Sequence, residues 1–216
     1  MATNQQRKQQ QRQHILQTAQ TLFMRDGFKA TKVSAIAAAA DVSQVTLYKY
    51  FDSKLNLGHQ VVLAMVNDGY ADSRAYATDP QLSYQEIVQK MVTLSTQMTD
   101  TMHPDFYRFV VRDMQGQLGN DETMQAYQAQ KRNFWSVVIQ RGREAGMIDP
   151  ALTDDALMLY LDMFIQYISS PAGQKIVAGG EQDAHFKALT RQIDHLFFYG
   201  FIGVPPTETK EGLSHE

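Results

Sequence analysis

A run of hydrogen-bonding side chains between residues 43 and 50 is the segment best suited to contact another molecule. It contains hydroxyl, amide and ammonium groups, carried by Ser43, Gln44, Thr46, Tyr48, Lys49 and Tyr50. Val45, Leu47 and Phe51 are interleaved with these polar residues and can turn toward a protein core. A polar, aromatic and weakly basic segment of this kind suits the base edges and phosphates of duplex DNA.

The charges of the chain are divided unevenly between its first quarter and the remainder. Residues 1–56 contain eight basic and three acidic side chains, a net charge of +5, whereas the other 160 residues contain 12 basic and 20 acidic ones, a net charge of −8. A basic first segment on an acidic remainder is typical of a protein whose N-terminal part binds a polyanion. The alternative is a chance excess of cations on a solvated surface.

The sequence gives little support to catalytic or cofactor chemistry. It contains no cysteine, which excludes disulfides, zinc–thiolate sites, iron–sulfur clusters and cysteine nucleophiles. No glycine-rich phosphate loop, G-x-S-x-G elbow or H-E-x-x-H sequence occurs. A possible metal set is formed by Asp183, His185, Asp194 and His195, but its two histidines are not spaced as an i, i+4 pair, and surface histidines are the alternative. We therefore expect a protein that is not an enzyme and that needs no metal or cofactor.

Helical periodicity of the apolar residues predicts the elements that would position the polar run. A first amphipathic helix is expected around Ile15 to Phe23, with Gly27 as its left-handed C-cap and Phe28 folded back on its last turn. Thr31 is expected to cap a short second helix, and a third runs from about Gln44 to Tyr50. Each of these helices has a clear start or stop signal.

The rest of the chain continues in the same periodicity. Asp52 or Ser53 can cap a fourth helix, and Pro104 is placed in a first helical turn. Further helices are expected at about 82–98, 104–117, 121–144, 153–170 and 183–199. No run alternates with period two for long enough to predict a sheet. The sequence therefore predicts an all-α protein of about nine helices.

Neither the N-terminus nor any later window predicts a membrane or export signal. The segment Met1 to Gln13 is rich in glutamine and has no apolar stretch that could act as a signal peptide. No window approaches 18 consecutive apolar residues. We expect a soluble, cytoplasmic protein with no membrane contact.

The two short helices, set between longer ones, suggest a helix-turn-helix. Ala37 and Ala40 supply the small residues needed where such helices cross. A wider pattern carries a family resemblance, through Ile15, Leu16, Ala19, Leu22, Phe23, Gly27, Phe28, Thr31, Ile36, Ala37, Ala40, Asp41, Val42, Ser43, Thr46, Leu47, Tyr48, Phe51, Ser53, Lys54 and Leu57. These residues resemble the DNA-binding domain of the TetR family of transcriptional regulators. The Leu-Tyr-x-x-Phe-x-x-Lys-x-x-Leu part at 47–57 is highly specific.

The resemblance implies a role for each residue of the polar run. The helix-turn-helix would be residues 32–51, in which Gln44 and Thr46 read bases. Ser43, Tyr48 and Tyr50 would divide between phosphate and base contacts, and Lys54 would hold the DNA backbone. Lys32 and Lys49 complete the expected DNA-contacting set. Two positions depart from the family pattern, since Asp41 stands where glycine is usual and Val45 where a small residue is common.

Residues 70–204 are expected to form a ligand-binding and dimerisation domain, again by resemblance. Methionines and aromatic residues are frequent there, and methionine is common on adaptable binding surfaces. The expected pocket is lined by Met91, Phe106, Phe109, Asp113, Met114 and Trp135. The alternative is that these side chains are ordinary core. Asp113 lies on an apolar helix face, so it must either orient a ligand amine or hydroxyl or pair with an arginine of another helix.

A helix at 157–168 is apolar on almost every side and therefore needs cover on every side. A second subunit can provide it, and the resemblance implies a dimer built from the two C-terminal helices. The expected interface residues are Leu157, Leu161, Phe164, Ile168, Ile193 and Leu196. The alternative is a central helix of a monomeric bundle.

These expectations combine into one hypothesis with two rivals. The leading hypothesis is a homodimeric transcriptional repressor whose DNA-binding domain, residues 9–69, binds a palindromic operator in double-stranded DNA. A small apolar or cationic effector would release it, and residues 1–8 and 205–216 would be flexible tails. One rival is a regulator of the same fold without an effector, acting through a protein partner or its own abundance. The other is an all-α enzyme with a DNA-binding head.

Overall fold

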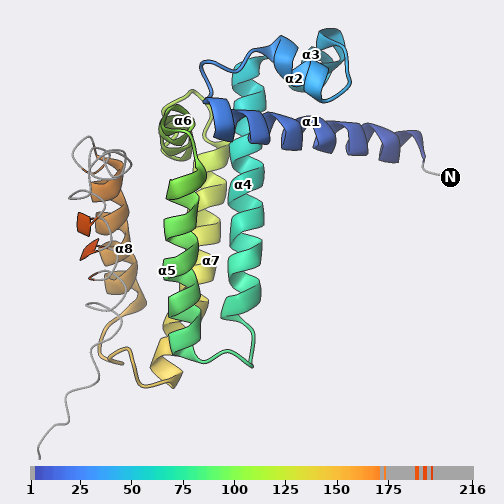
Figure 1. Ribbon diagram of the computed structural model, residues 1–216. Helices are drawn as coiled ribbons and strands as arrows, with labels where there is room; N and C mark the ends of the chain where they lie inside the picture. Colours follow the sequence, from blue (N-terminus) through green and yellow to red (C-terminus); the bar gives the residue numbers. More distant parts are fainter. Residues whose placement is uncertain (1–2, 171–172, 174–187, 190–191, 194–195, 197–216) are drawn as a thin grey trace, which may run out of the picture. The chain divides into compact units, whose positions relative to one another are not determined.

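The computed structural model describes residues 3–170, 173, 188–189, 192–193 and 196. This part of the chain is all-helical, as predicted, and contains no strand (Figure 1). Its helices are α1 Asn4–Asp26, α2 Val33–Ala39, α3 Gln44–Phe51, α4 Lys54–Ala77, α5 Tyr84–Thr101, α6 Pro104–Met114, α7 Glu122–Glu144 and α8 Asp154–Ser169. The ninth expected helix, at 183–199, falls mainly outside the described residues. None of the helices in the described ranges is long and apolar enough to cross a membrane.

The helix ends carry the signals that the sequence contains. Ser43 caps α3 and Thr153 caps α8, because each side-chain oxygen accepts a hydrogen bond from a backbone amide of the first turn. Pro104 opens α6, as expected, behind an N-cap at His103. The hydroxyl of Ser53 accepts the amide of Asn56 at 3.0 Å, so the cap of α4 is Ser53.

The described residues divide into two compact units that do not follow the expected boundary at residue 69. The first unit contains Met1–Asp72 and Gln97–Lys131, and the second contains Ser73–Thr96 and Arg132–Glu216. The first unit therefore includes α6, which we had expected in the second domain. The reason is burial, because Phe106 and Phe109 of α6 belong to the hydrophobic core of the first unit.

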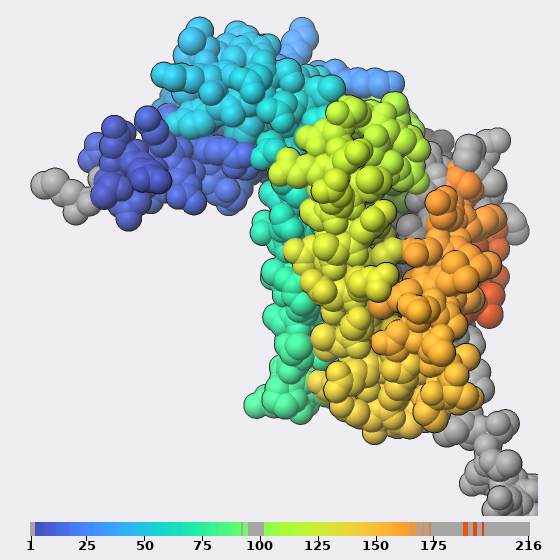
Figure 2. Space-filling view, turned by 180° about the vertical axis from the view of Figure 1, so that it is seen from behind, coloured from blue at the N-terminus to red at the C-terminus, as the bar shows by residue number. Residues whose placement is uncertain are grey.

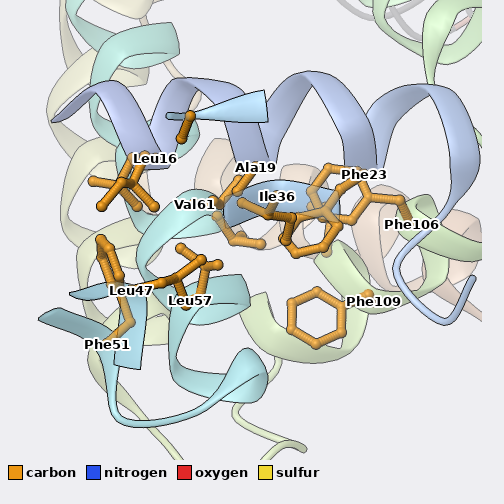
Figure 3. Close-up of a cluster of buried hydrophobic side chains, with 14 of the residues drawn as sticks. Leu16, Ala19, Phe23, Ile36, Leu47, Phe51, Leu57, Val61, Phe106 and Phe109 are labelled. Atoms are coloured by element: carbon orange, nitrogen blue, oxygen red, sulfur yellow. The ribbon is translucent and has the colours of Figure 1, made fainter. Parts of the chain in front are cut away.

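The core of the first unit is built from apolar side chains of five helices. Figure 3 shows Phe23 of α1 beside Phe106 of α6, with their ring centres 5.4 Å apart. The other labelled members are Leu16 and Ala19 of α1, Ile36 of α2, Leu47 and Phe51 of α3, Leu57 and Val61 of α4, and Phe109 of α6. Replacing a buried phenylalanine by alanine costs about 3–5 kcal/mol of folding free energy, so this cluster dominates the stability of the unit.

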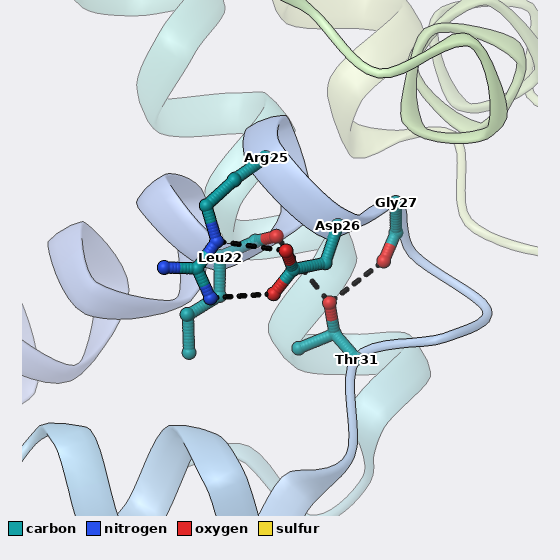
Figure 4. Close-up of polar contacts among 5 residues, drawn as sticks. All are labelled: Leu22, Arg25, Asp26, Gly27 and Thr31. Carbon is teal, nitrogen blue, oxygen red and sulfur yellow. Dashed lines mark hydrogen bonds and ion pairs between the residues drawn. The ribbon is translucent and has the colours of Figure 1, made fainter.

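The loop between α1 and α2 is tied to the end of α1 by a buried threonine. Gly27 has a positive φ of 85°, and Phe28 folds back so that its ring centre lies 5.1 Å from that of Phe23, as expected. Thr31 donates its hydroxyl to the carbonyls of Gly27 at 2.7 Å and Leu22 at 3.4 Å (Figure 4). The prediction that Thr31 caps α2 is therefore wrong, since the N-cap is Lys32 and has no side-chain capping bond.

The first turns of α6 hold the same loop from the other side. The backbone amide of Lys29 donates to Asp105 at 2.8 Å, and the amide of His103 donates to the carbonyl of Met24 at 2.8 Å. The imidazole of His103 lies so close to Gly27 that a Cβ there would be 2.6 Å from its Nδ1 atom. One hydrogen bond to the loop, one to the last turn of α1 and this close contact thus hold α6 against the junction of α1 with the loop.

The N-terminal end of α1 extends further than its apolar residues predict. The helix begins at Asn4 with a capping box, in which Thr3 and Gln6 satisfy each other's backbone amides. Residues 4–8, which we had expected to be a flexible tail, are therefore helical. Figure 1 shows α1 crossing α4 and continuing beyond it.

The second unit is stabilised at its first connection by one arginine. Arg141 of α7 donates to the carbonyls of Ala77 and Asp79, each at 3.1 Å, and to that of Leu82. Ala77 is the last residue of α4 and the other two carbonyls follow it, so the guanidinium caps the C-terminal end of this helix. Close packing surrounds it, because a Cβ on Gly142 would lie 2.5 Å from the side chain of Ile148. Burial raises the pKa of the Tyr84 hydroxyl in the same unit.

Candidate nucleic-acid interface

Helix α3 turns one polar face outward and anchors its opposite face in the core. Leu47 and Phe51 are fully buried, which fixes the rotation of the helix about its axis. Gln44, in the first turn, and Tyr48 and Lys49 are exposed. Val45 was expected to turn inward, but its side chain is 77% exposed. It lies two residues before Leu47, about 200° around the helix, so both cannot face the core.

Three of the predicted DNA-contacting residues are already held by other groups of the protein. The hydroxyls of Ser43 and Thr46 lie 2.9 Å apart, and Ser43 Oγ also accepts the Thr46 amide at 3.0 Å. Tyr50 donates its hydroxyl to the side chain of Gln11 in α1 at 3.0 Å. The outward face of α3 therefore consists of Gln44, Val45, Tyr48 and Lys49, and we call these four residues the α3 face.

Lys32 and Lys54 occupy different environments. Lys32 is exposed at the start of α2. Lys54, the first residue of α4, places its ammonium 4.7 Å from the centre of the Phe28 ring and donates to the carbonyl of Lys29 at 3.2 Å. Burial lowers the pKa of Lys54, and the charge of Asp105 partly offsets this effect. Lys54 is thus a positioned cation rather than a freely moving one.

The turns on either side of α3 both use aspartate in a left-handed conformation. The φ angles are 52° at Asp41 and 55° at Asp52. Asp41 stands where the family pattern has glycine, and aspartate is one of the few other residues that enter this region. The substitution is therefore compatible with the turn that the sequence predicts.

The residues expected to line a ligand pocket are divided between the two units. Phe106 and Phe109 lie in the core of the first unit, and Met114 packs against that core. Met91 and Trp135 are buried in the second unit. Asp113 is fully buried in the first unit, as its place on the apolar face of α6 predicts.

The partner of Asp113 is a histidine and not the arginine that we expected. His59 of α4 is also buried, and its Nδ1 atom forms a hydrogen bond with Asp113 Oδ1. Among the described residues the second carboxylate oxygen, Oδ2, has no hydrogen-bond partner. Sequence reasoning missed His59, although it follows Leu55 and precedes Val62 at helical spacing on the apolar side of α4.

The predicted dimer residues of α8 are spaced to share one side of that helix, which is largely buried within the chain. Leu157 and Leu161 are buried, and Phe164 is half-buried. Of the others, Ile193 is half-buried and Leu196 is exposed, while the side chain of Ile168 lies outside the described residues. The outward side of α8 carries Leu159, Met163 and Tyr167, which are four residues apart and exposed.

No group of three or more possible metal ligands occurs within the described ranges. Asp183, His185, Asp194 and His195 lie outside the described residues, so the expectation that they bind no metal is not tested.

Comparison with known proteins supports the helix-turn-helix assignment. Residues 15–61 match the family of bacterial regulatory proteins called the tetR family. The chain is 30% identical over 96 residues to the HTH-type transcriptional repressor KstR2 of Rhodococcus jostii, a match that covers 44% of this chain and 47% of KstR2. The aligned region thus spans about half the length of that relative.

Two solved structures show the same fold over most of the chain. A putative TetR-family transcriptional regulator from Mesorhizobium loti has a TM-score of 0.61 at 20% identity, covering 90% of this chain and 97% of its own. FadR of Bacillus subtilis, solved in complex with stearoyl-CoA, has a TM-score of 0.59 at 15% identity, covering 88% and 98%. Residues 15–61 therefore resemble the tetR family of bacterial regulatory proteins, and the chain shares its fold with these two solved structures.

Proposed function

We propose that this protein is a homodimeric transcriptional repressor that binds an inverted-repeat operator through α3 and is released by a small molecule. The observation that carries the DNA-binding part is the α3 face. Its exposed side chains are the Gln44 amide, the Val45 methyl groups, the Tyr48 phenol and the Lys49 ammonium, on a helix that buried Leu47 and Phe51 anchor in the core. A rigid helix of this kind fits the major groove, which is about 12 Å wide.

Each member of the α3 face has a matching group on DNA. The Gln44 amide can both donate to and accept from a base edge, and the Val45 methyl groups suit the methyl group of thymine. Tyr48 and Lys49 suit phosphate oxygens, which position a protein without reading sequence. We assign Lys32, Ser43 and Lys54 to phosphate contacts. Thr46 and Tyr50 would lie at the periphery of the protein–DNA interface.

A selection from random duplexes tests this proposal directly. The protein should enrich an inverted repeat and bind it more tightly than a scrambled duplex at physiological salt. Gln44→Ala should relax the preference at one or two base pairs, at a cost of about 1–3 kcal/mol there. Tyr48→Phe should instead weaken binding to all sequences. Equal affinity for the selected and the scrambled duplex would refute operator recognition.

The proposed effector site centres on Asp113. Its free Oδ2 atom is a buried acceptor in an apolar core, and such an atom costs folding free energy unless a ligand or water satisfies it. We propose an effector that is mostly apolar and carries one cationic or hydrogen-bonding group for this oxygen. FadR of Bacillus subtilis, which has this fold, was solved in complex with stearoyl-CoA, whose long acyl chain is apolar, and this supports an apolar ligand. Phe106, Phe109 and Met114 of the same unit remain predicted lining residues, whereas Met91 and Trp135 stay predictions of the sequence alone.

A compound screen separates this proposal from a regulator without an effector. Apolar compounds with one amine or hydroxyl group should raise the melting temperature and lower operator affinity about 5–150-fold, which is the usual range of allosteric coupling. Asp113→Asn keeps the shape of the side chain and should abolish the response to amines. Asp68→Asn, an exposed carboxylate in α4, is the control. If no compound gives both effects, the effector claim fails and a protein partner or protein abundance would govern DNA binding.

A further inference from the structure

The first ten residues of α1 form a helical segment that packs into no core. Residues 4–13, which we call the α1 extension, include no buried residue, and the first buried side chain of the helix is Ile15. In Figure 2 its dark blue surface extends outward from the lighter blue surface of α2 and α3. A polar helix gains no stability from packing, so this segment is held only by its capping box and its junction with the rest of the unit.

The α1 extension carries cations and no anions. Arg7, Lys8 and Arg12 lie within it, and the first acidic residue of the chain is Asp26. The other polar side chains are mostly glutamines, whose amides can donate hydrogen bonds to anionic oxygens. Clustered cations on one helix are typical of a surface that meets a polyanion.

The contacts at the base of the α1 extension show which way its cations point. Gln11 accepts a hydrogen bond from Tyr50 of α3 at 3.0 Å. Arg12 lies 5.3 Å from the centre of the Phe51 ring and donates to Gln60 at 2.5 Å. These residues therefore mark the side of α1 that faces the end of α3.

Arg7 and Lys8 lie four residues before Gln11 and Arg12, so they continue the same helix faces one turn further out. Four residues correspond to about 6 Å along the helix axis. Both side chains are exposed. The cationic side chains of Arg7 and Lys8 therefore lie on the α3 side of α1, one helical turn beyond the point where α1 contacts the proposed recognition helix.

We propose that the α1 extension is a second DNA-contacting surface, in which Arg7 and Lys8 bind phosphates that flank the groove occupied by α3. Continuity with α3 and the sign of the charge both favour the DNA backbone as the partner. This inference rests on the proposed function, because it requires that α3 engages duplex DNA.

Salt dependence of binding tests the proposal with a charge-matched control. The probe is the duplex selected by the wild-type protein, with at least ten base pairs of random flank on each side. A plot of log affinity against log salt has a negative slope. Arg7→Ala/Lys8→Ala should make this slope shallower by about 1.8 per protomer, since each lost phosphate contact removes about 0.9 from its magnitude. Lys90→Ala/Arg132→Ala removes the same two charges from exposed positions elsewhere and should leave the slope unchanged. Alanine favours helix, and circular dichroism would verify that the fold is kept.

Trimming the flanks gives a second readout. The wild-type protein should lose affinity when the flanks are removed, whereas Arg7→Ala/Lys8→Ala should lose none, and its selected consensus should equal that of the wild type. If the wild type prefers its selected duplex but the double variant keeps the wild-type slope and flank dependence, the α1 extension does not contact DNA and only this inference fails. If the wild type has no sequence preference at all, the proposed function fails instead.

Discussion

At the scale of single residues, the turn before α3 depends on a conformation that few side chains tolerate. Asp41 has a φ of 52°, and its side chain is exposed. A left-handed conformation costs an ordinary L-residue about 1–2 kcal/mol, whereas glycine avoids this cost but loses more backbone entropy on folding. The identity of residue 41 therefore affects the stability of the helix-turn-helix without any loss of packing.

We expect Asp41→Gly to leave the free energy of unfolding unchanged or to raise it by up to about 1 kcal/mol, and Asp41→Val to lower it by about 1–2 kcal/mol. Urea unfolding followed by far-ultraviolet circular dichroism measures both. Asp68→Val, at an exposed position with ordinary helical geometry, is the control and should cost only the difference in helix propensity. Equal costs for the two valine variants would contradict a strained turn.

The helix that carries the polar run and the turn before it were predictable from the sequence, whereas only one member of the buried His59–Asp113 pair was. The sequence places Asp113 on an apolar helix face, so its need for a partner follows from the pattern alone. The choice of His59 depends on how α4 and α6 meet, and no local signal encodes that contact. The prediction that Val45 faces the core was wrong for a different reason. It followed from the apolar side chain alone and ignored the position of Val45 on the helix, about 200° from Leu47.

At the scale of elements, helical periodicity located every described helix, but not every boundary. The α1 extension was missed because periodicity reports packing, and a helix without buried residues has no apolar pattern. The membership of α6 in the first unit was missed because it depends on contacts between Phe106 and residues far away in the chain. Thr31 precedes a helix and has a capping side chain, yet burial directs its hydroxyl back to α1.

The junction of the α1–α2 loop with α6 leads to a prediction about two glycines. Gly27→Ala should lower the free energy of unfolding by at least about 1–2 kcal/mol, because φ is 85° and the new Cβ would lie 2.6 Å from His103 Nδ1. Gly69→Ala should raise it by about 0.5–1 kcal/mol, since nothing lies within 4 Å and the position is inside α4. Chemical denaturation of both variants measures the difference. Adding His103→Ala to Gly27→Ala should restore only part of the loss, as the backbone strain remains.

At the scale of the whole molecule, we expect the outward side of α8 to be covered by a second subunit. Met163 and Leu159 are 63% and 62% exposed, and large exposed apolar side chains in a row are typical of interfaces. Leu157 and Leu161 face the opposite way and are buried within the chain. We therefore propose that Leu159, Met163 and Tyr167 form the subunit interface in place of Leu157 and Leu161. Phe164, Ile193 and Leu196 stay in the proposed interface.

Sedimentation distinguishes the two sides of α8. The wild type should have a mass near twice that of the chain, and Met163→Glu should give a folded monomer with weaker operator binding. Leu161→Glu should fail to fold, because an unpaired carboxylate would enter the core. A dimeric Met163→Glu variant with wild-type stability would place the subunit contact elsewhere.

The position of the one tryptophan determines how any of these changes can be observed. Trp135 is buried in the second unit, so the first unit, with its helix-turn-helix and α6, contains no indole. Tryptophan emission during unfolding therefore describes the second unit alone, whereas circular dichroism sums the helices of both. If the two curves have different midpoints, the units melt separately and no single two-state free energy describes the chain. Unfolding of the first unit, which contains the helix-turn-helix, would then leave the tryptophan emission unchanged.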